Sequence, residues 1–218
     1  MNLSFTEENY LKTIFHLNFN VDENVSTNAI AEALNTKAAS VTDMLKKLAD
    51  KQLVNYEKYQ GVNLTKDGER QAITVIRKHR LWEVFLVDKL DFKWDEVHEI
   101  AEELEHIHSE KLINRLDEFL EFPKTDPHGD PIPDKNGLLK SKELIPVSKL
   151  KIGDTGIISG VREHSAEFLK YLEKSGLILG ESLTITEVIA FDSSVMILIK
   201  DNQRMISREV AKNLLIAL

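Results

Sequence analysis

A proline- and glycine-rich segment divides this chain into parts that must fold differently. All five prolines lie in residues 123–146, and most of them fall in FPKTDPHGDPIPDKNG, residues 122–137. Proline lacks a backbone donor and clashes with the preceding helical turn, so helical order ends at such a segment. Residues 121–140 are therefore predicted to be loop and linker, with a helical region before them.

Residues 1–77 have the pattern of a winged helix-turn-helix. Apolar residues recur at helical spacing in TEENYLKTIFHL and then in two shorter runs. Ser26 or Thr27 can cap the first short helix, and the second is predicted over residues 38–50. The stretch LVNYEKYQGVNLTKDG has two strand-like halves around a turn at Gly61, which indicates a hairpin. Two short helices followed by a hairpin predict a winged helix.

The second short helix is the candidate recognition helix. It presents small and polar side chains, which can approach base edges, and residues 37–58 hold five lysines against three acids. Phosphate neutralisation carries much of DNA affinity, so a chain with so few basic residues is expected to bind as a dimer. The competing interpretation is a helical packing domain without a ligand. The predicted DNA-contacting residues are Lys37, Ala39, Ser40, Thr42, Asp43, Lys46, Lys47, Lys58, Tyr59 and Gln60.

Residues 78–120 are predicted to form two helices, the second running from about residue 94 to residue 120. This region has 6 basic and 12 acidic residues, and so holds most of the chain's net charge of −8. It contains HEIAEELEH, and at about 100° per residue four of its polar residues share one face of a helix, opposite the apolar ones. These four residues are His98, Glu102, Glu105 and His106.

That polar face indicates either a metal site or an ordinary solvated acidic helix. The chain has no cysteine, so ligands must be imidazole nitrogen and carboxylate or amide oxygen. His79 and Glu83 repeat the theme one turn apart. Such ligands suit Mn²⁺ or Fe²⁺, and Zn²⁺ or Co²⁺ would also bind. The residue four after His98 is Glu102, so the zinc-protease pattern is absent.

Residues 146–218 change character. SLTITEVIAF and SVMILIK are typical of strands, and EFLKYLEKSGL between short strands predicts one helix ending at Gly176. About five strands with one helix indicate a small barrel. The N-terminus lacks a basic signal-peptide region and no apolar run is long enough to span a membrane, so a cytoplasmic protein is expected.

Six stretches, taken together, make the chain similar to one family. They are TEENYLKTIFHL, IAEALNTKAASVTDMLKKL, LVNYEKYQGVNLTKDG, RKHRLWEVFL, VHEIAEELEHIHSE and PHGDPIP. It resembles the diphtheria-toxin-repressor family of metal-dependent transcription regulators, over about residues 5–133. Residues 146–218 resemble the SH3-like, FeoA-type domain of many members. The resemblance implies a mainly α N-terminal winged helix-turn-helix (1–77) and a helical metal-binding and dimerisation domain (78–140). A small all-β SH3-like barrel (146–218) follows.

The resemblance also implies two metal sites. The primary, activating site maps to Asn9, Glu102, Glu105 and His106. The ancillary site maps to His79, Glu83 and His98, with His164 and Glu167 of REHSAEFL as the matching ligands from the SH3-like domain.

Three positions depart from patterns within the family. Glu102 stands where iron-type members often have Cys, and this hard carboxylate favours Mn²⁺. Asn9 stands where Met or Asp is usual, and it offers an amide oxygen without charge. Lys12 stands where manganese-type members have Glu, so a fully manganese-type binuclear centre, in which His79 also serves the primary cluster, is in question.

The expected function is a metal-dependent repressor that controls metal-ion homeostasis, with Mn²⁺ or Fe²⁺ as effector and Zn²⁺ or Co²⁺ as substitutes in vitro. We expect a homodimer on a palindromic double-stranded operator, with no membrane and no small-molecule substrate. Two alternatives stay open. One is a metal-independent winged-helix regulator. The other is a di-metal carboxylate enzyme of ferritin-like type, for which Glu105 and His108 have the Glu-x-x-His spacing.

Overall fold

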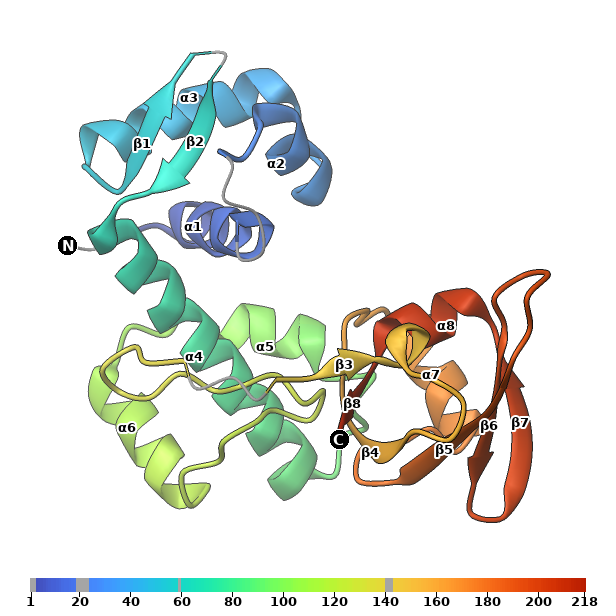
Figure 1. The fold of residues 1–218 in the computed structure, drawn as a ribbon. Coiled ribbons are helices and arrows are strands. Elements are labelled where there is room, and N and C mark those ends of the chain that lie inside the picture. The colour runs from blue at the N-terminus through green and yellow to red at the C-terminus, as the bar shows by residue number, and fades with distance from the viewer. Residues whose placement is uncertain (1–2, 19–23, 59, 140–142) are drawn as a thin grey trace. The chain divides into compact units, whose positions relative to one another are not determined.

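The computed structural model describes residues 3–18, 24–58, 60–139 and 143–218, and these form two compact units (Figure 1). The first unit draws on Met1–His79, Glu102–Asn114 and Pro133–Leu138, and the second on Arg80–Ala101, Arg115–Ile132 and Leu139–Leu218. Each unit is built from segments far apart in sequence. Three helices have residues in both units, so the three-part division expected from the sequence stays a prediction.

The first unit contains the predicted winged helix. Its elements are α1 (Phe5–Asn18), α2 (Thr27–Ala33), α3 (Ala38–Asp50), β1 (Val54–Glu57), β2 (Gly61–Leu64) and the start of α4 (Lys66–Leu90). Ser26 caps α2 by accepting a hydrogen bond from the backbone N–H of Ala29 at 3.1 Å. The strands pair antiparallel as a hairpin, as predicted, whereas Tyr59 at its tip lies outside the described residues.

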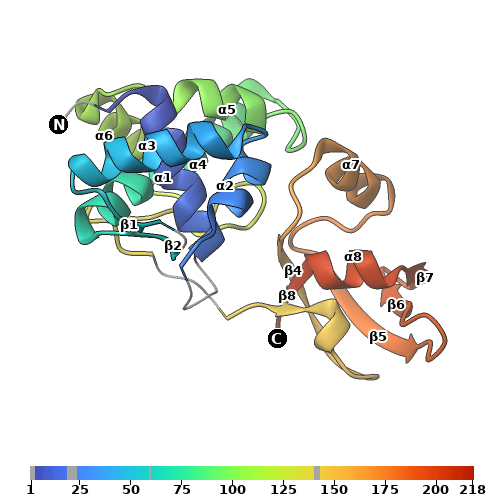
Figure 2. The ribbon, with the colours of Figure 1, turned by 90° about the horizontal axis from the view of Figure 1, so that it is seen from above.

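Apolar faces of these elements meet in one core. Figure 2 shows α1, α2 and α3 grouped beside the hairpin. Fully buried residues come from every helix of the group, as the amphipathic spacing predicts. They include Leu11, Ile14, Ile30, Val41, Leu45 and Leu48.

The predicted second helix of residues 94–120 is wrong in one respect, because the structure divides it. α5 covers only His98–Leu104 and α6 covers Glu110–Phe119. Between them, Ser109 accepts a hydrogen bond from the backbone N–H of Leu112 at 3.3 Å, which starts a new helix instead of continuing the old one. Glu105 and His106 consequently lie in a turn after α5, and not on its surface.

The second unit ends in a six-stranded antiparallel sheet, in the order β3-β8-β4-β5-β6-β7. Its elements are β3 (Ile145–Pro146), η1 (Val147–Lys149), β4 (Thr155–Val161), α7 (Ala166–Lys174), β5 (Ser182–Val188), β6 (Val195–Ile199), β7 (Asn202–Ile206), α8 (Arg208–Asn213) and β8 (Leu214–Ala217). The predicted small β domain is confirmed. It has a second short helix, α8, that the sequence pattern did not indicate.

A separate core holds this sheet together. Alternate strand residues point inward, among them Ile158, Leu183 and Ile197, and the apolar face of α7 covers them with Leu169 and Leu172. No helix within the described residues is long and apolar enough to cross a membrane.

Candidate metal centres

The turn after α5 meets α1 through ion pairs. Glu105 is fully buried, and Lys12 Nζ lies 2.7 Å and 2.9 Å from its two carboxylate oxygens. His79 Nδ1 lies 2.6 Å from Glu105 Oε2, and Lys12 Nζ also lies 3.4 Å from Glu102 Oε1. Burial by itself would raise the pKa of Glu105, but the His79 hydrogen bond and the charges of Lys12 and His79 lower it. Glu105 is therefore held as a carboxylate.

His106 is held by a different residue of α1. Its Nδ1 lies 2.6 Å from Glu8 Oε2, and its ring stacks on Phe5 with 4.5 Å between centroids. Glu8 is buried and also lies 3.4 Å from Lys78 Nζ. The sequence did not indicate Glu8 as a candidate ligand, because the resemblance pointed to the next residue, Asn9.

Asn9 is not paired with any of the other three predicted primary ligands. Its Oδ1 is buried and accepts no hydrogen bond from the described residues. A buried acceptor without a donor carries a free-energy cost that a bound cation would relieve. His106 Nε2 lies 3.9 Å from Glu105 Oε1, so two of the predicted primary ligands are close together. Among the described residues, the groups of three His or acidic ligand atoms within 4.8 Å of one another do not include Glu102, Glu105 and His106. The amide, carboxylate and imidazole groups are nevertheless donor types that suit a divalent ion.

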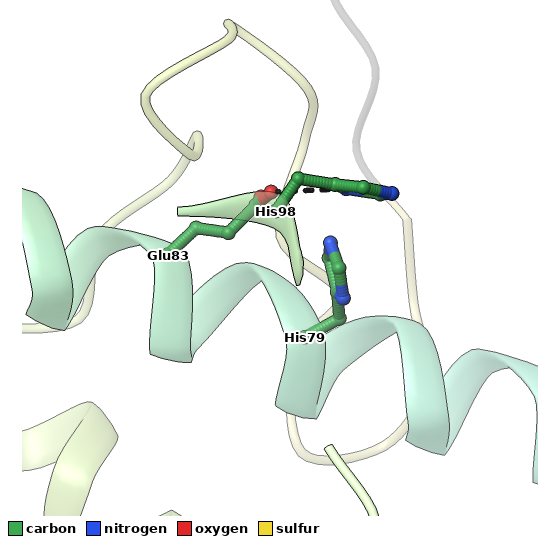
Figure 3. Close-up of side chains that lie close together, drawn as sticks. All are labelled: His79, Glu83 and His98. Carbon is green, nitrogen blue, oxygen red and sulfur yellow. Dashed lines mark ion pairs between the residues drawn. The ribbon is translucent and has the colours of Figure 1, made fainter. Parts of the chain in front are cut away.

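The predicted ancillary residues gather around α4. Figure 3 shows His79 and Glu83 one turn apart on this helix, with His98 beside Glu83. One ligand atom from each of the three lies within 4.8 Å of the others, and His98 Nδ1 is 3.6 Å from Glu83 Oε1. This confirms that the three side chains are close together, while their role as ligands stays a prediction.

A second group around Glu83 was missed. Glu83, Asp126 and His128 are all buried, and their ligand atoms also lie within 4.8 Å of one another. His128 Nε2 lies 2.7 Å from the carbonyl oxygen of Trp94, which leaves Nδ1 facing Glu83 at 3.6 Å. A histidine fixed in this way through one nitrogen has the other free for a metal. The Asp-x-His spacing of Asp126 and His128 was the available signal.

The acidities of this group are strongly perturbed. Burial, together with the charges of Glu83 and Asp130, raises the pKa of Asp126 to about 7. The pKa of His128 is raised as well: its burial acts in the opposite direction, but its hydrogen bond and charge interaction with Glu83 outweigh that. Two acids and an imidazole forced together in this way are typical of a site that takes up a cation.

The two residues predicted from the C-terminal domain are placed differently. The His164 ring lies 5.1 Å from that of His128, and its Nε2 is buried without a hydrogen bond. Burial and the charge of His128 lower the pKa of His164, which favours the neutral, metal-binding form. Glu167 is exposed in the first turn of α7.

The predicted DNA-contacting residues lie on the surface of α3 and the hairpin. They are exposed except for Thr42, which is half-buried and donates to the carbonyl of Ala38 at 3.0 Å, and Tyr59, which lies outside the described residues. Lys47 Nζ is 3.1 Å from Glu7, a buried acid of α1. These side chains are therefore on the surface, and their contacts with DNA stay a prediction.

Three family models match the chain in succession. Residues 2–62 match the N-terminal DNA-binding domain of iron-dependent repressors, residues 65–134 match their metal-binding and dimerisation domain, and residues 145–218 match the FeoA domain.

Individual proteins agree with these models. The iron-dependent repressor IdeR of Mycobacterium tuberculosis is 38% identical over 130 residues, which are 59% of this chain and 55% of that relative. The diphtheria toxin repressor of Corynebacterium jeikeium is 29% identical over 88% of this chain and 78% of its own length. The chain thus spans about half the length of the IdeR relatives it matches.

Solved structures are similar over nearly the full length. A manganese-dependent transcriptional repressor in complex with manganese has a TM-score of 0.89 and 32% identity, covering 97% of this chain and 99% of that one. The manganese regulator SloR has a TM-score of 0.78 and 36% identity, with 97% of each chain covered.

Proposed function

The chain belongs to the iron-dependent repressor family, and we propose that it is a DNA-binding repressor activated by a divalent metal ion. Control of metal-ion homeostasis follows as its physiological role. The observation that carries the proposal is the gathering of buried carboxylates and imidazoles around Glu83 and Glu105. Such groups are costly to bury without a cation.

We propose Mn²⁺ or Fe²⁺ as the effector. Every candidate ligand is a hard oxygen or an imidazole nitrogen, and Glu102 supplies a carboxylate, all of which suit these ions. Similar structures are described as manganese-dependent repressors, and one, ScaR, has been solved with Zn²⁺ and with Cd²⁺. Zn²⁺ or Co²⁺ would accordingly substitute in vitro.

The proposed ligands form two centres. The first consists of Asn9, Glu102, Glu105 and His106, with Glu8 as a further carboxylate from α1. The second is built on Glu83, which both groups of clustered side chains share. Its candidate members are His79, Glu83, His98, Asp126, His128, His164 and Glu167.

In the first centre, α1 and the turn after α5 supply ligands from opposite sides. When bound, the metal would supply positive charge that joins these ligands. The residues of α1 would then hold the winged helix in the arrangement that binds DNA, and linkage requires that DNA binding tighten metal binding equally.

The proposed target is a palindromic operator read by a homodimer. The α3 helix of each subunit would enter the major groove with Ala39, Ser40 and Thr42, while Lys46 and Lys58 would contact phosphates. Successive grooves on one face of DNA lie about 34–36 Å apart, which sets the spacing of the two half-sites. Such a partner places the protein in the cytoplasm. The metal is an effector, so no small-molecule substrate is turned over.

Operator binding measured with and without metal tests the proposal. We expect Mn²⁺ or Fe²⁺, added back after a chelator, to raise affinity for an operator fragment by roughly 5–150-fold, the usual range of allosteric coupling. Glu102→Ala should lose much of this increase. Its neighbour Glu103→Ala, exposed on α5, is the matched control. Equal affinity with and without metal would contradict the proposal.

One observation favours a metal-independent regulator as the second candidate. Lys12 and Glu8 already connect α1 to the turn after α5 through contacts of 2.7 Å and 2.6 Å. If these pairs alone fixed the winged helix, operator binding would be strong in chelator.

A further inference from the structure

Lys12 is placed where a cation would be expected. It follows Glu8 by four residues and Asn9 by three, so all three side chains share one face of α1. Its ammonium group contacts both carboxylate oxygens of Glu105 at 2.7 Å and 2.9 Å and faces Glu102 at 3.4 Å. The Lys12 side chain is only 12% exposed and that of Glu105 is 0% exposed. This is not a solvated surface ion pair.

A divalent ion bound to these oxygens would lie close to the ammonium group. Metal–carboxylate bonds are about 2.0–2.6 Å long, so an ion on Glu105 would lie within about 5 Å of Lys12 Nζ. At that distance two cations repel strongly in a partly buried site. Lys12 also contacts both Glu105 oxygens, so an incoming ion would compete with it for them.

Resting on the proposed function, we infer that Lys12 is a built-in cation that competes with the metal for Glu102 and Glu105. It stabilises the two carboxylates in the metal-free protein and so keeps α1 joined to the turn after α5. It also raises the metal concentration at which this centre fills. Lys12 is thus a residue that sets metal affinity, and the centre responds only when metal is abundant enough to displace it.

The test isolates this centre and removes the competing charge. In a Glu83→Gln background, which disables the other centre, Mn²⁺ binding is measured by calorimetry for Lys12 and for Lys12→Met, which has a similar length without the charge. We expect Lys12→Met to bind Mn²⁺ at least about tenfold more tightly, while Lys12→Arg keeps the weaker affinity. Lys51→Met is the matched control, since Lys51 pairs with buried Glu7 at 2.6 Å and touches no candidate ligand.

Thermal unfolding in chelator gives a second measurement that does not depend on bound metal. Lys12→Met should melt at a lower temperature than the parent because Glu105 loses a counter-charge, and Mn²⁺ should restore more stability to it than to the parent. Lys12→Gln, which keeps a hydrogen-bond donor, serves the same comparison if the methionine variant does not fold.

Unchanged Mn²⁺ affinity in Lys12→Met and Lys12→Gln, together with loss of that binding in Glu102→Gln, would overturn the role of Lys12. Metal-dependent operator binding by the wild type would then still stand. Metal-independent operator binding and no Mn²⁺ uptake in any variant would instead overturn both this inference and the proposed function.

Discussion

Asp126 is the residue whose protonation state most directly opposes two properties: the stability of the metal-free protein and the binding of a metal. Its pKa of about 7 is well above its ordinary value of 3.8, so the folded protein favours the protonated form. Stability from this group is fully present below about pH 4 and is lost as the pH rises from there to about 7. Metal binding at this proposed site would need the carboxylate, and would therefore remove a proton from it.

We predict that Asp126→Asn stabilises the metal-free protein at pH 8 by about 2–4 °C in melting temperature, and by less at pH 5, where only part of this stability has been lost. The same change should abolish most of the Mn²⁺-induced stabilisation. Thermal unfolding at both pH values, in chelator and in Mn²⁺, measures this. The control is Asp67→Asn, an exposed aspartate paired with Arg70 on α4. Lower stability of Asp126→Asn than of the wild type in chelator at pH 8 would contradict it.

The sequence predicted which residues gather around α4, but it did not predict all of their partners. His79, Glu83 and His98 were found because i, i+4 spacing and the family resemblance both mark them. Glu8 and Lys12 were not predicted to face the segment at 102–106, because contacts between positions 90 or more residues apart depend on tertiary packing. Asp126 and His128 lie in a loop, where no periodicity indicates which way a side chain points.

The start of α4 depends on a close approach between two elements. A Cβ at Gly68 would lie 1.9 Å from the carbonyl oxygen of Leu53, in the segment that leads from α3 to β1. Alanine in place of glycine in a helix usually stabilises by about 0.5–1 kcal/mol. Here the backbone of a buried residue stands in the way, so the sign reverses.

We expect Gly68→Ala to lower the free energy of unfolding by about 1–3 kcal/mol, the range of overpacking, as measured by denaturant titration. Glu69→Ala, exposed in the same turn, should change it by less than about 0.5 kcal/mol. A stabilised Gly68→Ala protein would show that α4 can shift away from Leu53 without cost.

Elements with strong local signals were predicted well. The winged helix followed from amphipathic spacing, a capping residue and a hairpin turn, all of which act over a few residues. The break between α5 and α6 and the six-residue helix α8 were missed. Both depend on serine caps, at Ser109 and Ser207. The apolar periodicity continues across the break before α6 and so does not show it, while α8 is too short for its periodicity to be detected.

For the whole molecule, an excess of acid has to be reconciled with DNA as the partner. The net charge of −8 works against binding to a polyanion, and the basic residues near α3 are few. Doubling the number of phosphate contacts through a dimer answers this, since each contact releases counterions. Dimerisation is therefore as necessary to the proposed function as the metal.

The exposed aromatic side chains near α6 are the best candidates for the dimer surface. Phe119 is 60% exposed and Phe122 is 55% exposed, and the ring of Phe119 lies 6.4 Å from that of Phe85 on α4. Neighbouring exposed aromatics on helices mark protein interfaces more often than isolated ones do.

We predict that Phe119→Asp weakens self-association by at least about 30-fold, the effect of losing an interface hot spot of roughly 2 kcal/mol. Analytical ultracentrifugation measures this, and operator affinity in saturating Mn²⁺ should fall with it because a monomer reads one half-site. Phe191→Asp is the control, since Phe191 is 97% exposed in the turn between β5 and β6, away from α4 and α6 in sequence. If Phe119→Asp stays dimeric while Phe191→Asp becomes monomeric, the subunits associate through the C-terminal domain. If neither change affects association, the exposed aromatic side chains near α6 do not form the dimer surface.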